Sequence, residues 1–240
     1  MEVRVTGIWG YQQAMRSMYM SKRSYNQEIE ERINRACANV LNSQGYCSGL
    51  NDEFTDMMDK LFRIGSEHMT LLRFISFDIV TIGMHRAGQD DIDAHARRFD
   101  NRIIRESTRL STFGLEKSTF YEGKILTDGE MAGFLGLELP DTVGLEDEEG
   151  NTLTFHKAIN GYVLDGYEEN KDVLRGLYML SIPSNFVSQI NITEFAHIYK
   201  LRNDEGGANP EVKQWAEGVL TCLNTVCPWI TRDLLMSIPN

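Results

Sequence analysis

Hydrophobic residues recur every three to four positions in several stretches of the chain, which is the spacing that places them on one face of a helix. The helices predicted in this way cover residues 11–24, 29–40, 54–64, 167–179, 192–202 and 210–223. Asn191 precedes the fifth of these helices as an N-cap, and Glu194 then occupies its third helical position. Pro210 lies in the first turn of the last helix, where its missing N–H costs nothing.

Two other stretches carry the pattern of strands. Residues 3–7 alternate apolar and polar side chains, and residues 74–82 are β-branched and aromatic up to Gly83. The polar segment 90–111 contains no helix breaker, and we predict a helix there. Within 114–155, short apolar runs broken by turn residues predict loops and small surface strands.

Together these elements predict an α+β fold, dominated by helices, with a single domain over residues 1–240. The formal net charge of −11 argues against a general binder of nucleic acid or anionic membranes, so an anionic ligand needs a local basic pocket. The stretch 69–84 carries charged residues and is shorter than the roughly 20 apolar residues of a membrane-spanning helix. The N-terminus lacks the apolar core of a signal peptide, and we expect a cytoplasmic protein.

The remaining reactive side chains form none of the common catalytic patterns. The four cysteines, Cys37, Cys47, Cys222 and Cys227, lack the paired spacing of a zinc site, and we expect free, buried thiols. The histidines are scattered, and although His95 follows several aspartates, we expect no metal site. Glycine-rich phosphate loops and the HExxH and GxSxG motifs are absent.

Arginines gather near the middle of the chain. Arg98, Arg102, Arg105 and Arg109 are spaced four, three and four positions apart, so they share one face of the predicted helix. Such guanidinium groups repel one another unless carboxylates or a bound anion neutralise them. One interpretation is an ion-paired surface, and the alternative is phosphate binding, because the guanidinium fork matches phosphate geometry. The carboxylates available for ion pairing are Asp90, Asp91, Asp93 and Asp100.

The segment RRFDNRIIRESTR, residues 97–109, resembles the motif RHRxxSxNExSxR of the flavin-dependent thymidylate synthase family. Arg97, Ser107 and Arg109 coincide with the first arginine, the second serine and the last arginine of that motif. The motif's histidine, third arginine, first serine, asparagine and glutamate are replaced, in that order, by Arg98, Phe99, Arg102, Ile104 and Arg105.

A second segment, NITEFAHIYKLR at 191–202 followed by ANPEV, is similar to the family pattern N-x-R-x-L…LR followed by AQWEI. The interval from Asn191 to Arg202 equals the family's interval. Between the two segments, Arg175 stands where the family carries an arginine before a proline. The resemblance covers nearly the whole chain and implies a fold in which helices pack around a small central, mostly antiparallel sheet.

The resemblance implies a homotetrameric enzyme that transfers a methylene group from methylenetetrahydrofolate to dUMP and reduces it with FAD and NADPH, without a cysteine nucleophile. The implied nucleotide-binding residues are Ser107, Arg109, Arg175 and Arg202. The implied FAD-binding residues are Arg97, Arg98 and Asn191. Each also has a structural interpretation: Asn191 as a helix cap, Arg202 as a cation at a helix C-terminus and His68 as a surface residue.

Several positions differ from the family. Arg73 and Phe74 stand at a Glu-His pair that follows a His-x-Ser/Thr pattern, and Ala94 stands at an expected glutamine. Thr193 and His197 stand at an arginine and an asparagine. Two functions therefore stay open. The first is flavin- and folate-dependent C5 methylation of dUMP or a similar pyrimidine deoxynucleotide, which gives dTMP or an analogue. The second is a divergent nucleotide-binding homologue that has lost this catalysis and acts as a sensor or regulator.

Overall fold

A computed structural model describes residues 1–95, 101–105, 138, 140–158, 161–169, 183–203 and 209–238. The chain separates into two compact units. The first consists of Met1–Ile82, Gly88–Arg105 and Asn185–Asn240, and the second of Gly83–Ala87 and Glu106–Ser184. The single domain expected over residues 1–240 remains a prediction.

A four-stranded sheet forms the centre of the first unit. Its strands are β1 (Glu2–Trp9), β2 (Ser76–His85), β7 (Pro183–Asn191) and β3 (Asn101–Arg105), in the order β1-β2-β7-β3. β1 and β2 are antiparallel, as are β3 and β7. The predicted α+β fold with a central, mostly antiparallel sheet is therefore confirmed.

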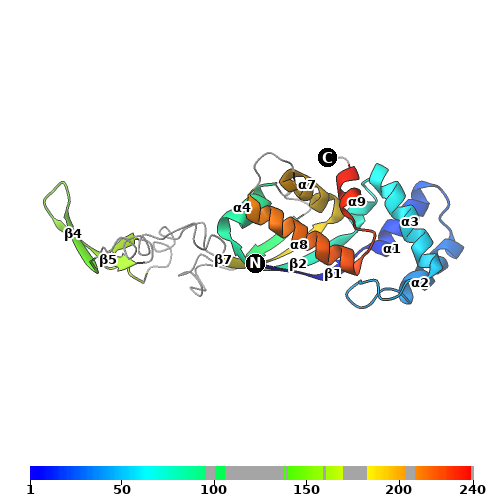
Figure 1. Ribbon diagram of the computed structural model, residues 1–240, viewed down its shortest axis with the longest axis horizontal. Coiled ribbons are helices and arrows are strands. Elements are labelled where there is room, and N and C mark those ends of the chain that lie inside the picture. The colour runs from blue at the N-terminus through cyan, green and yellow to red at the C-terminus, as the bar shows by residue number, and fades with distance from the viewer. Residues whose placement is uncertain are drawn as a thin grey trace. The chain divides into compact units, whose positions relative to one another are not determined.

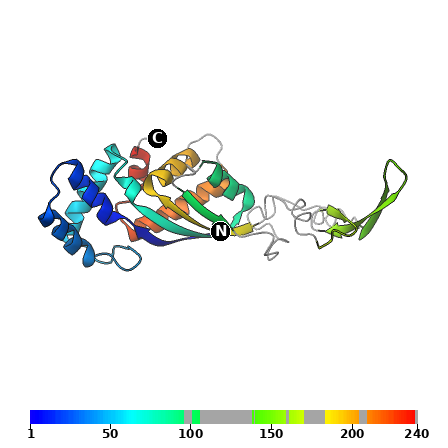
Figure 2. The ribbon, with the colours of Figure 1, turned by 180° about the vertical axis from the view of Figure 1, so that it is seen from behind.

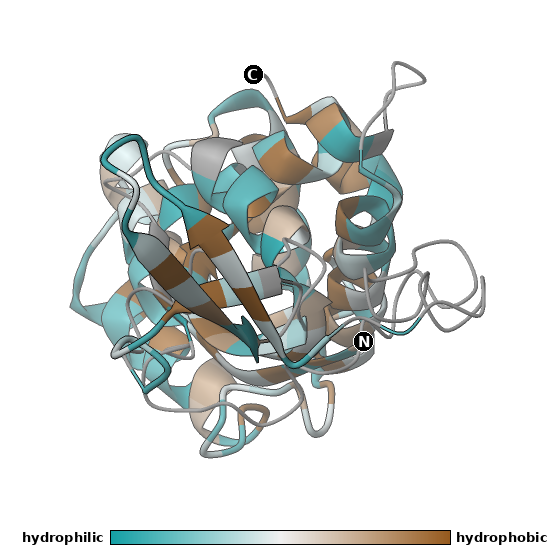
Figure 3. Cartoon of the chain, turned by 90° about the vertical axis from the view of Figure 1, so that its left-hand side faces the viewer, coloured by the Kyte–Doolittle hydropathy of each residue, from teal (hydrophilic) through white to brown (hydrophobic). Residues whose placement is uncertain are grey.

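Two helices, α7 (Ile192–Asn203) and α8 (Pro210–Val226), supply the core that packs on this sheet. Figures 1 and 2 show α8 running across one face of the strands. The Trp215 indole N–H of α8 donates to the Thr81 hydroxyl of β2 at 2.9 Å. Phe195 of α7 packs edge-on against Phe77 and Trp215, with ring centroids 5.6 and 6.2 Å apart. Figure 3 shows hydrophobic and hydrophilic positions alternating along helices of the chain, as expected where a helix buries one face.

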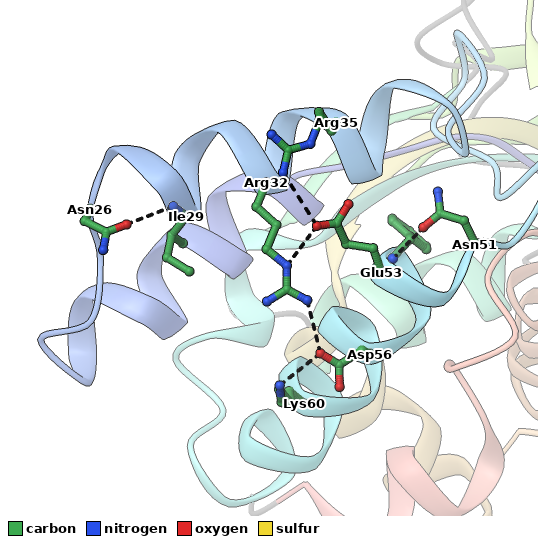
Figure 4. A network of polar contacts seen from close by, with 9 residues as sticks. Asn26, Ile29, Arg32, Arg35, Asn51, Glu53, Asp56 and Lys60 are labelled. Carbon is green, nitrogen blue, oxygen red and sulfur yellow. Dashed lines mark hydrogen bonds and ion pairs between the residues drawn. The ribbon is translucent and has the colours of Figure 1, made fainter.

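Three further helices, α1 (Tyr11–Ser21), α2 (Gln27–Ala38) and α3 (Asp52–Glu67), gather beyond one end of the strands (Figure 2). Local signals determine where α2 and α3 begin. The Asn51 side chain accepts a hydrogen bond from the Phe54 N–H at 2.7 Å, which satisfies a free donor in the first turn of α3 (Figure 4). Asn26 caps α2 in the same way.

Removal of the α3 cap has a predictable cost. We expect Asn51→Ala to lower the free energy of unfolding by about 1 kcal/mol, because the Phe54 N–H loses its acceptor. Asn51→Asp is the matched control, since its carboxylate keeps the accepting oxygen and favours the helix N-terminus. Urea unfolding of both variants measures the difference, and equal losses would contradict the capping role.

Most of the predicted helices are present. The helices predicted at 11–24, 29–40, 54–64, 192–202 and 210–223 correspond to α1, α2, α3, α7 and α8. The strand predicted at 74–82 begins later, because Leu72–Phe74 forms a 3-10 turn, and it continues through Gly83 to His85. Gly83 has a positive φ of 72°, which glycine adopts without strain, so it does not end the strand. β7 and the short helix α9 (Arg232–Ser237) were not predicted.

The helix predicted over residues 90–111 is confirmed at 90–95, which belong to α4 (Arg86–His95), and is wrong at Asn101–Arg105, which form β3. The rest of that prediction lies outside the described residues. β3 contains adjacent isoleucines and pairs with β7 from Asn101↔Ile190 to Arg105↔Phe186. Pairing with a distant strand overrides the weak local helix preference of this polar segment. The helical face expected for the arginines of this segment is therefore wrong for Arg102 and Arg105, whereas Arg98 and Arg109 lie outside the described residues.

The second unit contains a three-stranded antiparallel sheet of β4 (Thr142–Glu146), β5 (Thr152–Ala158) and β6 (Gly161–Leu164). These strands confirm the small strands predicted within 114–155, as far as that region is described. Residues 167–169 form no helix, and the rest of the helix predicted at 167–179 lies outside the described residues. Among the described helices, none has the length and apolar character needed to cross a membrane.

Candidate functional site

Arg202 is the predicted nucleotide-binding residue that lies within the described part of the chain. It is near the end of α7 and only 7% exposed. Its Nη2 donates to the backbone oxygen of Asp91 at 3.0 Å, and its Nη1 lies 4.0 Å from an Asp91 carboxylate oxygen. The buried Nε has no hydrogen-bond partner among the described residues. Arg202 therefore keeps one donor for a further acceptor.

The pattern of α7 explains why a cation lies in the interior. Phe195, Tyr199 and Arg202 are spaced four and three positions apart, so they follow the same helix face. Phe195 and Tyr199 are fully buried on that face. An isolated buried charge is unfavourable, and acceptors must compensate it. Asp91 supplies acceptors for the Nη groups and leaves the Nε unmatched.

Asn191, the predicted flavin contact, is used as the cap of α7. Its side-chain oxygen accepts hydrogen bonds from the Glu194 N–H at 2.9 Å and from the Thr193 hydroxyl at 2.7 Å. The structural interpretation as a helix cap is thus confirmed. An amide oxygen has two lone pairs, and these two hydrogen bonds occupy both of them. The Asn191 amide nitrogen is therefore the group left to donate to a ligand.

Arg105 lies at the end of β3 and is ion-paired with α4. Its Nη2 lies 2.7 Å from an Asp93 carboxylate oxygen and donates to the Gln89 backbone oxygen at 3.2 Å, while its Nη1 pairs with Asp90. The ion-paired interpretation is confirmed for this residue. Two carboxylates neutralise the guanidinium, so Arg105 offers no net positive charge to a phosphate.

The carboxylates of α4 thus connect two segments that are far apart in sequence. Asp90 and Asp93 bind Arg105 of β3, and Asp91 binds Arg202 of α7. We call these five residues the α4 cluster. Its acidic half was visible in the sequence as the run at 90–93, but the pairing of Asp91 with Arg202 has no local signal, because 111 positions separate the two residues.

The remaining predicted site residues either lie outside the described part of the chain or are exposed at its surface. Those outside the described residues are Arg97, Arg98, Phe99, Ser107, Arg109 and Arg175. Phe74 is exposed at the end of a 3-10 turn, next to Arg73. His68 follows the last turn of α3 and is exposed, which confirms its interpretation as a surface residue.

A second group of titratable side chains lies in the second unit. The His156 Nε2 lies 3.0 Å from an Asp165 oxygen and 3.3 Å from a Glu168 oxygen. All three side chains are at least one-third exposed. An exposed histidine beside two carboxylates is an ordinary surface arrangement, and among the described residues nothing else at this position indicates a bound metal.

A sequence model of the thymidylate synthase complementing protein family matches residues 11–229. The chain belongs to this family. The match confirms the resemblance found in the two arginine-containing segments. No curated protein sequence matches the chain.

Solved structures of thymidylate synthase X and of a UMP/dUMP methylase share the fold of the chain. Thymidylate synthase X from Helicobacter pylori, solved with FAD and dUMP, is 14% identical, covers 98% of this chain and 100% of its own, and has a TM-score of 0.57. A second structure of the Helicobacter pylori enzyme with FAD and dUMP is 13% identical, with coverages of 98% and 99% and the same TM-score of 0.57. The UMP/dUMP methylase PolB from Streptomyces cacaoi, bound with 5-Br dUMP, is 13% identical, with coverages of 98% and 94% and a TM-score of 0.53. Because the sequence identity is so low, the similarity to these structures establishes the fold alone.

Proposed function

We propose that this chain is a flavin-dependent enzyme that methylates C5 of dUMP or a similar pyrimidine deoxynucleotide, giving dTMP or an analogue. The observation that carries the proposal is Arg202, a buried guanidinium with an unmatched Nε, at a position where the family resemblance implies nucleotide binding. Family membership and the nucleotide complexes of the similar structures support it.

Charge explains why a buried arginine suits this role. A nucleotide phosphate is an anion, and the chain has a formal net charge of −11, so its surface does not attract the ligand. A desolvated guanidinium interacts more strongly with phosphate or uracil oxygens than an exposed one does. In the proposal, the further nucleotide contacts implied by the family resemblance are Ser107, Arg109 and Arg175.

FAD binding is part of the proposal. Among the proposed FAD contacts, Asn191 lies within the described residues, and its hydrogen bonds limit which of its atoms can contact the flavin. The amide nitrogen of Asn191 can donate to a flavin oxygen, while its carbonyl oxygen is occupied by α7. Arg97 and Arg98 are the other proposed contacts. Bound FAD would supply the redox chemistry that reduces the transferred carbon. NADPH and methylenetetrahydrofolate as co-substrates and a cytoplasmic location belong to the same proposal.

We also propose that the enzyme is a homotetramer. Ile104 of β3 and Val187 of β7 are paired neighbours, and their side chains are 77% and 49% exposed. Adjacent exposed β-branched residues on a sheet are unfavourable in water. A subunit interface over these strands would cover them.

The visible spectrum of the purified protein tests the proposed activity. We expect a yellow protein with a flavin absorption band, and release of tritium from dUMP labelled at C5 when methylenetetrahydrofolate and NADPH are added. Omission of the folate is the control, since turnover requires the carbon donor. A colourless protein that binds dUMP and does not bind added FAD would contradict the proposed activity.

A second function is favoured by the engagement of Asn191 in the helix cap, together with the replaced motif positions at Arg98, Phe99, Arg73 and Phe74. In this alternative, the chain binds the nucleotide as a sensor or regulator without turnover. Calorimetry that finds tight nucleotide binding, in a protein without flavin or activity, supports the alternative. Complementation of a thymidine auxotroph would exclude it.

A further inference from the structure

The loop at residues 42–48 is held tightly against neighbouring elements. The Ile8 N–H donates to the Gln44 backbone oxygen at 2.8 Å, and the Cys47 N–H donates to the Val226 backbone oxygen at 3.0 Å. Gly45 has a φ of 78°, and a Cβ there would lie 1.7 Å from the Ile8 oxygen, so only glycine fits. The position of Cys47 beside the end of α8 is therefore well determined.

Cys227 follows Val226 directly and ends α8, where its N–H donates to the Leu223 oxygen at 2.8 Å. Standard bond lengths and the 3.0 Å bond from Cys47 to Val226 bring the Cα atoms of Cys47 and Cys227 to within about 7 Å. Disulfides span Cα separations of about 4.4 to 6.8 Å. The backbone thus brings these two cysteines close to bonding distance.

The two thiols differ in a way that suits reaction with each other. Cys227 is fully buried, and Cys47 is partly exposed. Burial raises the pKa of the Cys227 thiol well above its usual value. A hydrogen bond from Cys227 lowers the pKa of Cys47, so the accessible sulfur is the better thiolate.

We propose that Cys47 and Cys227 are a reversible redox pair, which a small peroxide converts to a disulfide between the 42–48 loop and the end of α8. The Cys47 thiolate attacks a peroxide oxygen, the O–O bond breaks, and the leaving alkoxide or hydroxide takes a proton. The Cys47 sulfenic acid that results is attacked by the Cys227 sulfur, and its hydroxyl leaves as water. Two electrons pass from the thiols to the peroxide, and any external dithiol reverses the reaction.

The other two cysteines lie in different surroundings. Cys37 is buried in α2, and burial raises its pKa to about 11, so it holds little thiolate. Cys222 lies on α8, with its sulfur 3.5 Å from the Val3 backbone oxygen. We therefore expect the peroxide to oxidise Cys47 and Cys227 and to leave Cys37 and Cys222 as thiols. The redox pair is independent of the proposed nucleotide chemistry, in which no cysteine takes part.

Intact-mass measurement and peptide mapping of the full-length protein, treated with stoichiometric hydrogen peroxide, test the pair. We expect the loss of two hydrogens, a fall from four reactive thiols to two after denaturation, and a crosslinked peptide that joins Cys47 to Cys227. Dithiothreitol should restore the original mass. Cys222→Ser is the matched control and should oxidise as the native chain does.

Cys47→Ser should abolish the intramolecular crosslink while the protein keeps its fold, because the exchange is nearly isosteric and Cys47 is partly exposed. Circular dichroism verifies the fold of this variant. Oxidation of the native chain that stops at sulfinic acid on Cys47, or a disulfide that contains Cys222, would overturn the proposal. A crosslink that persists in Cys47→Ser would do the same.

Discussion

Arg202→Ala is expected to weaken the binding of dUMP by about 100-fold, measured by isothermal titration calorimetry. A hydrogen bond to a charged group contributes about 1.5 to 3 kcal/mol, and about 1.4 kcal/mol corresponds to a factor of ten in affinity. In the proposal, the Arg202 Nε is the buried donor that meets the ligand. Arg109 is a second nucleotide contact implied by the family resemblance, and combination with Arg109→Ala should abolish binding.

Arg232→Ala is the matched control for this experiment. Arg232 is an arginine of the same unit whose side chain is 62% exposed and pairs with Glu217, so its removal should leave dUMP affinity unchanged. Arg202→Lys separates charge from geometry, because lysine keeps the cation and loses the planar fork. Its affinity should lie between those of the native chain and Arg202→Ala. Native affinity in the folded Arg202→Ala variant would refute the proposed pocket.

Trp215→Ala is expected to lower the free energy of unfolding by about 3 to 5 kcal/mol, which is the usual cost of removing a large buried aromatic side chain. Trp215 is fully buried in the first unit. Its ring contacts Phe195 of α7 and Phe186 of β7, with centroids 6.2 and 6.5 Å away. Urea unfolding followed by circular dichroism measures the loss.

Two variants separate the causes of this loss. Trp215→Phe keeps an aromatic ring and removes the donor to the Thr81 hydroxyl, so we expect a smaller loss of about 1 to 3 kcal/mol. Trp9→Ala removes a tryptophan that is 43% exposed and donates to the Asp78 carboxylate, and we expect a smaller loss of about 1 to 2 kcal/mol. Equal losses for Trp215→Ala and Trp9→Ala would contradict the assignment of Trp215 to the core.

The cap of α7 shows what the sequence by itself determined. Asn191, with Glu194 three positions later, predicted the start of the helix, and the observed bond joins the same two residues at 2.9 Å. The apolar spacing of α2, α3 and α8 likewise predicted helices that the structure contains. These features depend on residues within one or two turns of each other, so the local pattern contains the information needed to predict them.

The candidate site was predictable in its residue types and less so in its contacts. The acidic run at 90–93 and the nearby arginines indicated ion pairing, which Arg105 makes with Asp90 and Asp93. The partner of Arg202, in contrast, is Asp91, 111 positions away. Only the packing of α7 beside α4 decides that contact.

Tertiary structure alone decided the segment after α4. A helix was predicted through residues 101–105 because nothing in their local pattern opposes it, yet they form β3. Helix and strand preferences differ by less than about 1 kcal/mol per residue, whereas β7 offers a whole row of backbone hydrogen bonds. Ile104 lies opposite Val187, so the partner strand is more than 80 positions away in the sequence. A short stretch of sequence around β3 does not include β7, its pairing partner. The fold, rather than the local sequence, therefore determines where Arg102 and Arg105 of β3 lie.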